Sequence, residues 1–210
     1  MTLTKQVKDL LSRLKHRFNI FNKHSELMDK YLKELRGIEI GAASYRNFGL
    51  NTLNIDINDN KRVDTVYCQR QMELTGYVAK VDIVSSGDDL PFKDNFWDFV
   101  LTSHVLEHFF DPIKALKEWN RVVRDGGYIC LIIPDKRKTF DKERERTTLE
   151  ELIQRHESQA SNSEIAAHHN VWVLEDVLEL CKYLNFNVVE YQEADTKVKD
   201  SFIVMVKVSK

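Results

Sequence analysis

The sequence predicts an α/β protein built on a doubly wound, mostly parallel sheet. Short β-branched runs alternate with helical patterns from Ile38 to Ile133, the order that builds parallel strands joined by right-handed crossovers. The first run stops at Gly41 and the second, Leu53 to Ile57, carries an acid near its end, Asp56. In a parallel sheet this pairing lies at the edge where nucleotide-like ligands bind.

Composition narrows the class of protein. The chain has 210 residues, 42% of them hydrophobic, and a formal net charge of −2, so we expect one medium domain with an appendage and no nucleic-acid partner. Its three cysteines are far apart and form no CxxC pair, which indicates a reducing compartment. The sequence shows no apolar run of about 20 residues and no signal peptide. We therefore expect a cytoplasmic protein without an integral membrane segment, and the oligomeric state is not predicted.

Residues 1–36 are predicted to form an N-terminal helical cap on a domain covering residues 37–210. Apolar residues from Leu3 to Phe21 recur every three or four positions, and the opposite face is basic. A membrane-surface or partner-binding helix is the alternative, but any half-buried helix shows this pattern. A second helical stretch, His24 to Leu35, ends at Gly37.

The remaining elements follow in order. Residues 44–51 leave room for at most one or two helical turns. Asp111-Pro112 opens a helix in the favoured order of cap and proline, and Gly126-Gly127 is expected to end it. Further helices are expected at Val66–Leu74, Thr148–Arg155 and from Leu174, and strands at Lys80–Val84, Trp97–Leu101, Tyr128–Ile133, Phe186–Tyr191 and Phe202–Val208.

The turn after the first strand suits a ribose-containing ligand. One ionised carboxylate, that of Asp56, can accept hydrogen bonds from both hydroxyls of a ribose. The small residues Gly41, Ala42 and Ala43 leave main-chain donors open to a ligand. The dinucleotide pattern GxGxxG is absent, however, and a lone glycine turn is a weak signal that also fits a plain strand end.

Four stretches together carry a family resemblance. EIG, the acid in NID, DDLPFKDNFWDFVLTSHVLEHFFDP and LKEWNRVVRDGGYICLIIPD occur in order over most of residues 37–135. They resemble the class I S-adenosylmethionine-dependent methyltransferases, in particular small-molecule methyltransferases with an LPF, DxV and LEH pattern. The resemblance implies a Rossmann-like sheet of seven strands with an antiparallel last strand, S-adenosylmethionine as cofactor, and a small-molecule acceptor such as a sugar or other metabolite.

The resemblance also implies site residues. It places Glu39 beside the cofactor turn, Asp56 and Ile57 at the ribose, a loop at the adenine, and Ser103 and His104 near the methionine and sulfonium. Ser86 in the adenine loop stands where many members carry an aspartate. The implied cofactor-binding residues are Glu39, Gly41, Ala42, Ala43, Asp56, Ile57, Ser86, Gly87, Asp88, Ser103 and His104.

The shortened turn leaves a second function open. The usual GxGxG is reduced here to GAASY. A non-catalytic relative that keeps the fold and serves as a binding or partner subunit through its basic N-terminal helix is the alternative. Asp56 and the intact LEH triplet favour the enzyme.

Four histidines are candidates for the base that methylation of a hydroxyl would use. They are His104, His108, His168 and His169. His108 lies in the LEH triplet and could equally be structural. The pair His168-His169 is expected either to face the acceptor pocket or to be a satisfied pair in a loop.

A metal-dependent hydrolase or methyltransferase is a rival interpretation of the same histidines. HVLEH would place His104 and His108 one helical turn apart, with Glu107, Asp111 and Asp135 nearby in sequence. The glutamate is at the wrong offset for a zincin, and we predict no metal site.

The segment Pro134–Glu164 is rich in charge and is expected to leave the core. It is a candidate lid over the acceptor or a surface loop. Lys136, Arg137 and Lys138 could attract an anionic acceptor, and a solvated charge run explains them equally well.

Overall fold

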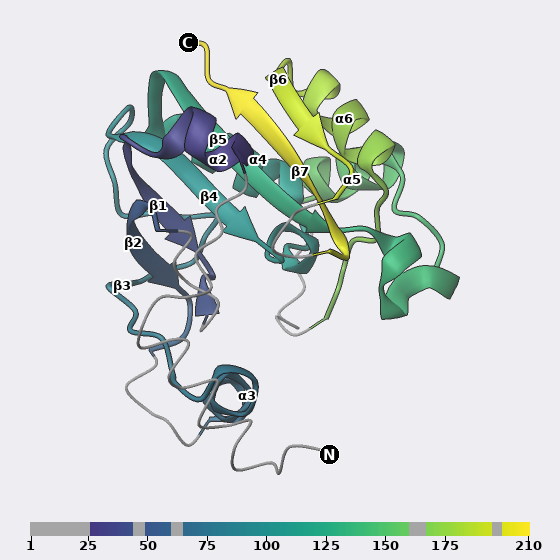
Figure 1. Cartoon of the computed structure of the whole chain (residues 1–210). Helices are drawn as coiled ribbons and strands as arrows, with labels where there is room; N and C mark the ends of the chain where they lie inside the picture. The colour runs from purple at the N-terminus through teal and green to yellow at the C-terminus, as the bar shows by residue number, and fades with distance from the viewer. Residues whose placement is uncertain (1–25, 44–48, 60–64, 160–166, 195–198) are drawn as a thin grey trace.

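The structure, a computed structural model, describes residues 26–43, 49–59, 65–159, 167–194 and 199–210 (Figure 1). The predicted amphipathic helix from Leu3 to Phe21 and most of the connector 44–51 lie outside the described residues. The described helices include none long and apolar enough to cross a membrane.

Seven strands form one sheet in the order β3-β2-β1-β4-β5-β7-β6. The strands from β3 to β5 pair in parallel, and β7 runs antiparallel to both β5 and β6. This confirms the predicted mostly parallel sheet with an antiparallel last strand. The strands are β1 (Arg36–Ile40), β2 (Asn51–Asp56), β3 (Ile83–Val84), β4 (Trp97–Ser103), β5 (Val123–Pro134), β6 (Asn187–Gln192) and β7 (Ser201–Lys207).

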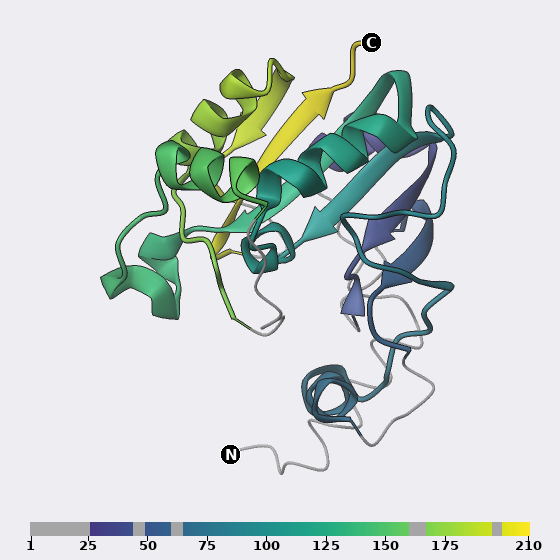
Figure 2. The same ribbon diagram turned by 180° about the vertical axis from the view of Figure 1, so that it is seen from behind.

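Helices cover both faces of the sheet (Figures 1 and 2). One face carries α4 (Pro112–Val122), α5 (Leu149–Glu157) and α6 (Leu174–Tyr183), whose apolar sides form the larger core around Trp119 and Trp172. The other face carries α2 (Glu26–Leu32), which buries Leu27, Met28 and Leu32 in a second cluster on β4, β5 and β7. α3 (Val66–Thr75) lies apart from both layers.

The predicted role of Gly126-Gly127 as a helix stop is wrong. α4 ends at Val122, and both glycines lie inside β5. A Cβ atom on Gly127 would come 2.4 Å from the carbonyl oxygen of Asp98 on β4. Gly127 therefore lets two strands approach closely, which is the second common reason for a glycine in a strand.

Two other predicted elements differ in length. β3 covers only Ile83–Val84 of the expected strand Lys80–Val84, and β4 continues to Ser103. The segment after β5 is more ordered than its charge indicates. It contains the 3₁₀ turns η3 (Lys136–Lys138) and η4 (Phe140–Glu143) and buries Asp141, Thr147 and Leu152.

Candidate functional site

The turn after β1 has the backbone conformation of a ligand-binding loop. Gly41 has φ +63° and donates its N–H to the carbonyl of Ile55 at 2.8 Å. A Cβ atom there would meet Val105 Cγ2 at 2.6 Å. Ala43 also has a positive φ, +44°, a conformation that costs a non-glycine residue about 1–2 kcal/mol. The structure thus holds alanine in a conformation that glycine would adopt without this cost.

Asp56 ends β2 beside this turn and is buried, with 4% of its surface exposed. Its Oδ1 accepts from the N–H and the side-chain amide of Asn58 at 2.8 and 3.2 Å, and its Oδ2 accepts from Tyr67 Oη at 2.9 Å. Burial, together with the charge of Asp56, raises the pKa of Tyr67. A carboxylate has about four acceptor positions, so a ribose diol needs at least one of these donors, such as the more distant Asn58 amide, to move.

The adenine loop predicted at Ser86–Asp88 is held by contacts within the protein. Ser86 Oγ donates to Asp88, whose other oxygen accepts from Lys114 Nζ at 2.9 Å. Burial raises the pKa of Asp88, but these two bonds outweigh it and lower the pKa. Trp119 Nε1 donates to the Gly87 carbonyl at 2.7 Å. The loop therefore has a fixed shape, and its contact with adenine stays a prediction.

The other predicted cofactor residues lie along the same edge. Glu39, inside β1, is buried, and Ile57, just after β2, is 45% exposed. Ser103 is the last residue of β4, and His104 follows it with φ +55°. His104 Nε2 lies 3.7 Å from Asp200 Oδ1, and its Nδ1 lies 3.9 Å from Glu107 Oε1.

A cluster of three side chains lies just beyond His104. Glu107, His108 and His168 each bring one ligand atom into a group whose members are all within 4.8 Å of one another. Glu107 is 1% exposed, and neither of its carboxylate oxygens has a hydrogen-bond partner among the described residues. Burial, and the nearby charges of Asp141 and Asp200, raise the pKa of Glu107 to about 8.

The two imidazoles of the cluster are oriented by acceptors behind them. His168 Nδ1 lies 2.6 Å from Asp141 Oδ2, and His108 Nδ1 lies 3.0 Å from the carbonyl of Ala167. Burial raises the pKa of Asp141, but its bonds to Arg144 and His168 outweigh this and lower it. Because an ionised carboxylate and a carbonyl can only accept, both Nδ1 atoms donate, and each neutral ring has its lone pair on Nε2.

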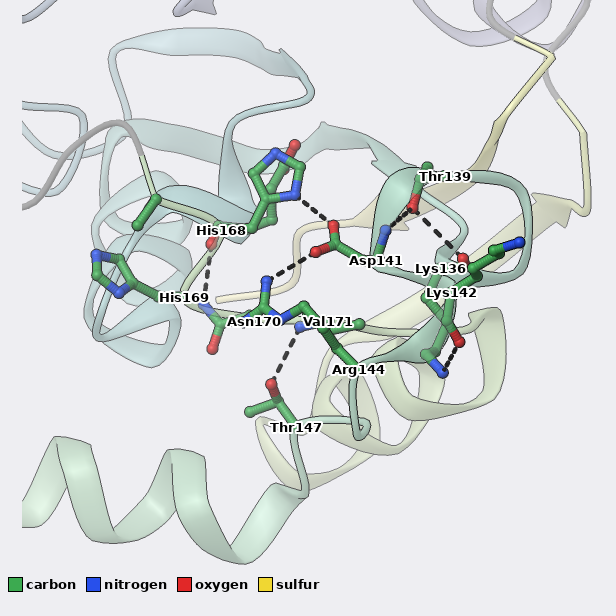
Figure 3. A network of polar contacts seen from close by, with 12 residues as sticks. Lys136, Thr139, Asp141, Lys142, Arg144, Thr147, His168, His169, Asn170 and Val171 are labelled. Atoms are coloured by element: carbon green, nitrogen blue, oxygen red, sulfur yellow. Dashed lines mark hydrogen bonds and ion pairs between the residues drawn. The ribbon is translucent and has the colours of Figure 1, made fainter.

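The segment that carries His168 is attached to the turn after β4 (Figure 3). The N–H groups of His169 and Asn170 donate to the Glu107 carbonyl at 2.8 and 3.1 Å, and Asn170 Nδ2 donates to the Phe109 carbonyl at 2.6 Å. The predicted histidine pair is thereby divided. His168 points toward Asp141 (Figure 3), whereas the rings of His169 and Phe110 lie nearly perpendicular to each other.

The structure brings together three of the residues considered for a metal site from the sequence and leaves out His104, Asp111 and Asp135. His104 and His108 do not share a helical turn, because His104 has a left-handed backbone and only Leu106–His108 form a 3₁₀ turn, η2. Asp111 caps α4 and contacts His156, and Asp135 is paired with Arg137. The residues that meet are Glu107, His108 and His168. No local sequence pattern marks Asp141 or Asn170, because their hydrogen-bond partners are distant in sequence.

A groove elsewhere on the surface is separate from this edge. It is lined by the end of α6 and by β6, including Lys182, Asn185 and Tyr191. It contains none of the predicted site residues, so we do not assign it to the ligand site.

The sheet order and the edge together define the class of this protein. The strand order is that of a Rossmann-like methyltransferase fold, and a positive-φ glycine turn after β1 and a buried acid at the end of β2 lie at the edge where the ligand is predicted. The comparisons with known proteins agree. A family model described as a methyltransferase domain matches residues 36–131.

The chain is also similar to several relatives and solved structures. An uncharacterized protein of Methanocaldococcus jannaschii is 26% identical over 171 residues, which are 81% of this chain and 74% of that protein. The rice chloroplastic 2-methyl-6-phytyl-1,4-hydroquinone methyltransferase 2 is 32% identical over 119 residues, 52% of this chain. The match covers only 32% of the rice protein's length. A SAM-dependent methyltransferase of Methanosarcina mazei has a TM-score of 0.56 at 18% identity, with 88% of this chain and 97% of that chain covered.

Residues 36–131 match the methyltransferase-domain family, and the fold is similar to that of S-adenosylmethionine-dependent methyltransferases. The two features expected to meet S-adenosylmethionine are both present, since Gly41 has a positive φ and Asp56 is a buried carboxylate. Their contact with the cofactor stays a prediction. The family match favours the enzyme over the non-catalytic relative considered from the sequence.

Proposed function

We propose that this protein transfers the methyl group of S-adenosylmethionine to a hydroxyl group of a small molecule. The observation that supports it is the cluster of Glu107, His108 and His168 at the end of β4, beside the predicted methionine end of the cofactor site. It brings nitrogen lone pairs and a carboxylate together where an acceptor proton has to be removed.

The bound cofactor supplies an activated methyl group on sulfur. The chain has then to hold an acceptor oxygen in line with that methyl group, and positioning of this kind can lower the barrier by several kcal/mol. The ordered segment from η3 to α5 is connected to the cluster through Asp141, which accepts from His168, and this supports placing the acceptor on that side. It remains our candidate for the predicted lid.

Two acceptor classes are candidates. A sugar is the expectation from the sequence, and a quinol is the substrate named for the rice relative and, as demethylmenaquinone, for a Staphylococcus carnosus relative that is 42% identical over 62 residues. The proposed attraction of an anionic acceptor by residues 136–138 has weaker support. Lys136 and Lys138 donate to the carbonyls of Lys142 and Glu193, and Arg137 binds Asp135.

The test has two stages. Calorimetric titration with S-adenosylmethionine and with S-adenosylhomocysteine should show micromolar binding of both. Sugars and quinols are then incubated with methyl-labelled cofactor, and the products are examined by mass spectrometry for one added methyl group on oxygen. A folded protein that binds neither ligand would exclude the proposal.

A further inference from the structure

We propose that Glu107, His108 and His168 bind a divalent transition-metal ion such as Zn²⁺. Two imidazoles and one carboxylate are a donor set that proteins use for zinc and for ferrous iron, with coordination positions left open. The three ligand atoms lie within 4.8 Å of one another, and His108 Nε2 lies 3.9 Å from Glu107 Oε1. Shifts of about 1 Å would bring them to the 2.0–2.2 Å ligand distances of zinc.

The strongest support for a metal site is the environment of the Glu107 carboxylate. It is 1% exposed, and among the described residues neither oxygen has a hydrogen-bond partner. Two imidazole nitrogens, His104 Nδ1 and His108 Nε2, both lie 3.9 Å from its Oε1. A buried carboxylate is costly unless it is paired or coordinates a metal. No side-chain cation of the described residues forms an ion pair with it apart from these histidines.

The groups behind the histidines form the arrangement found around metal sites. A metal-binding histidine usually donates its other N–H to a carboxylate or a backbone carbonyl. His168 donates to Asp141 and His108 to the Ala167 carbonyl, so the Nε2 atom of each is the one that can bind an ion. Arg144 Nη1, 2.8 Å from Asp141, balances the charge of that carboxylate.

The segments that carry the ligands are joined by main-chain bonds. Glu107 and His108 lie on η2. His168 is followed by His169 and Asn170, whose backbone N–H groups both donate to the Glu107 carbonyl. The site is therefore held by the fold, and one ion would link two segments about 60 residues apart. This distinguishes it from exposed acidic groups on a surface.

The location gives the ion a role, which rests on the proposed function. With three protein ligands, a position remains for an acceptor oxygen, whose pKa an ion lowers. Because the ion occupies the Nε2 lone pairs of His108 and His168, these histidines do not then act as the base, and the hydroxyl proton leaves to water. The oxygen lone pair then forms the bond to the methyl carbon as the carbon–sulfur bond breaks, and sulfur keeps that electron pair.

The experiment measures ion binding directly. Protein without a histidine tag is treated with chelator, transferred to chelator-free buffer and titrated with Zn²⁺ by calorimetry, and the bound metal is counted by mass spectrometry after gel filtration. We expect one ion per chain. Glu107→Gln and His168→Gln should each weaken binding by more than about 100-fold, and Asp141→Asn by about 10- to 100-fold.

His156→Gln is the matched control. His156 contacts Asp111 and Lys117 outside the cluster, so its zinc affinity should stay within about twofold of the wild type. Folding of each variant is followed by thermal unfolding in chelator, and Glu107→Gln should unfold near the wild-type midpoint because the carboxyl group that it replaces is buried without a hydrogen-bond partner. Added Zn²⁺ should raise the midpoint of the wild type and His156→Gln only.

Two results would overturn the inference. One is that chelated wild type takes up no ion. The other is that Glu107→Gln keeps the wild-type zinc affinity, which would place any ion on the surface. Titration of the same samples with S-adenosylhomocysteine separates the two proposals. Lost zinc binding with intact cofactor binding rejects only the metal, and the converse rejects only the proposed function.

Discussion

The two sides of the ligand edge are built differently. On the cofactor side, from β1 to β3, the site consists of backbone conformation at Gly41 and Ala43 and one carboxylate, Asp56. That carboxylate is bound by Asn58 and Tyr67, which follow it within 11 residues. The cofactor side is therefore made from contacts that are local in the chain.

The acceptor side, from β4 to α6, is made from contacts between distant segments. His108 bonds to Ala167 59 residues later, Asn170 bonds to Phe109 61 residues earlier, and His168 bonds to Asp141 27 residues earlier. The predicted cofactor site needs only a short motif in the sequence. The predicted acceptor site needs side chains from distant segments, which a network of hydrogen bonds holds in place. The comparison implies that the two sides can be damaged separately.

The largest effect is expected from Asp56→Ala. A ribose diol loses two hydrogen bonds to a charged acceptor, each worth about 1.5–3 kcal/mol, so the affinity for S-adenosylhomocysteine should fall at least about 100-fold by calorimetry. Zinc affinity should stay unchanged. Unaltered cofactor affinity would show that Asp56 does not bind the cofactor. It would also contradict the description of the cofactor side given above.

Asp135→Asn is expected to destabilise the acceptor side. Asp135 is buried and accepts from the backbone N–H, Nε and Nη2 of Arg137 at 2.6–3.1 Å. We expect a loss of about 1.5–3 kcal/mol in the free energy of unfolding at pH 7, measured with urea, while cofactor affinity changes little.

The same variant has a predicted pH dependence. Burial raises the pKa of Asp135, but its bonds to Arg137 outweigh this, so its folded pKa is below the unfolded value. The stabilisation is therefore complete above the unfolded pKa and is lost as pH falls through the folded pKa. The difference between wild type and Asp135→Asn should shrink toward pH of about 2. A constant difference would show that the charge is not its source.

The smallest effect is expected from Thr148→Ala. Thr148 Oγ1 accepts from the N–H of Glu151, whose carboxylate accepts from the N–H of Thr148, so the pair forms the capping box of α5. Its removal should cost about 1 kcal/mol of unfolding free energy without changing cofactor affinity. Thr148→Ser keeps the cap and should behave as the wild type. An equal loss in both variants would point to the lost methyl group.

The elements that were predicted correctly are those with local signals. The helix from Asp111-Pro112, the capped helix after Thr148 and the strands near residues 97, 187 and 202 follow from caps, proline and β-branched runs. Gly126-Gly127 was misinterpreted because two glycines are equally typical of a helix stop and of closely packed strands. Only the neighbouring carbonyl of Asp98 distinguishes the two.

The sequence by itself determined the mostly parallel sheet, the resemblance to methyltransferases and the positions of Gly41 and Asp56, because a turn and a strand end depend on residues close together in the chain. Only the tertiary structure decided which histidines meet. The end of β4 sets where residues 104–108 lie, and hydrogen bonds from Asn170 to the turn after β4 bring His168 to Glu107 while His169 turns to Phe110. Contacts over such separations depend on the packing of the whole fold, which no local pattern records.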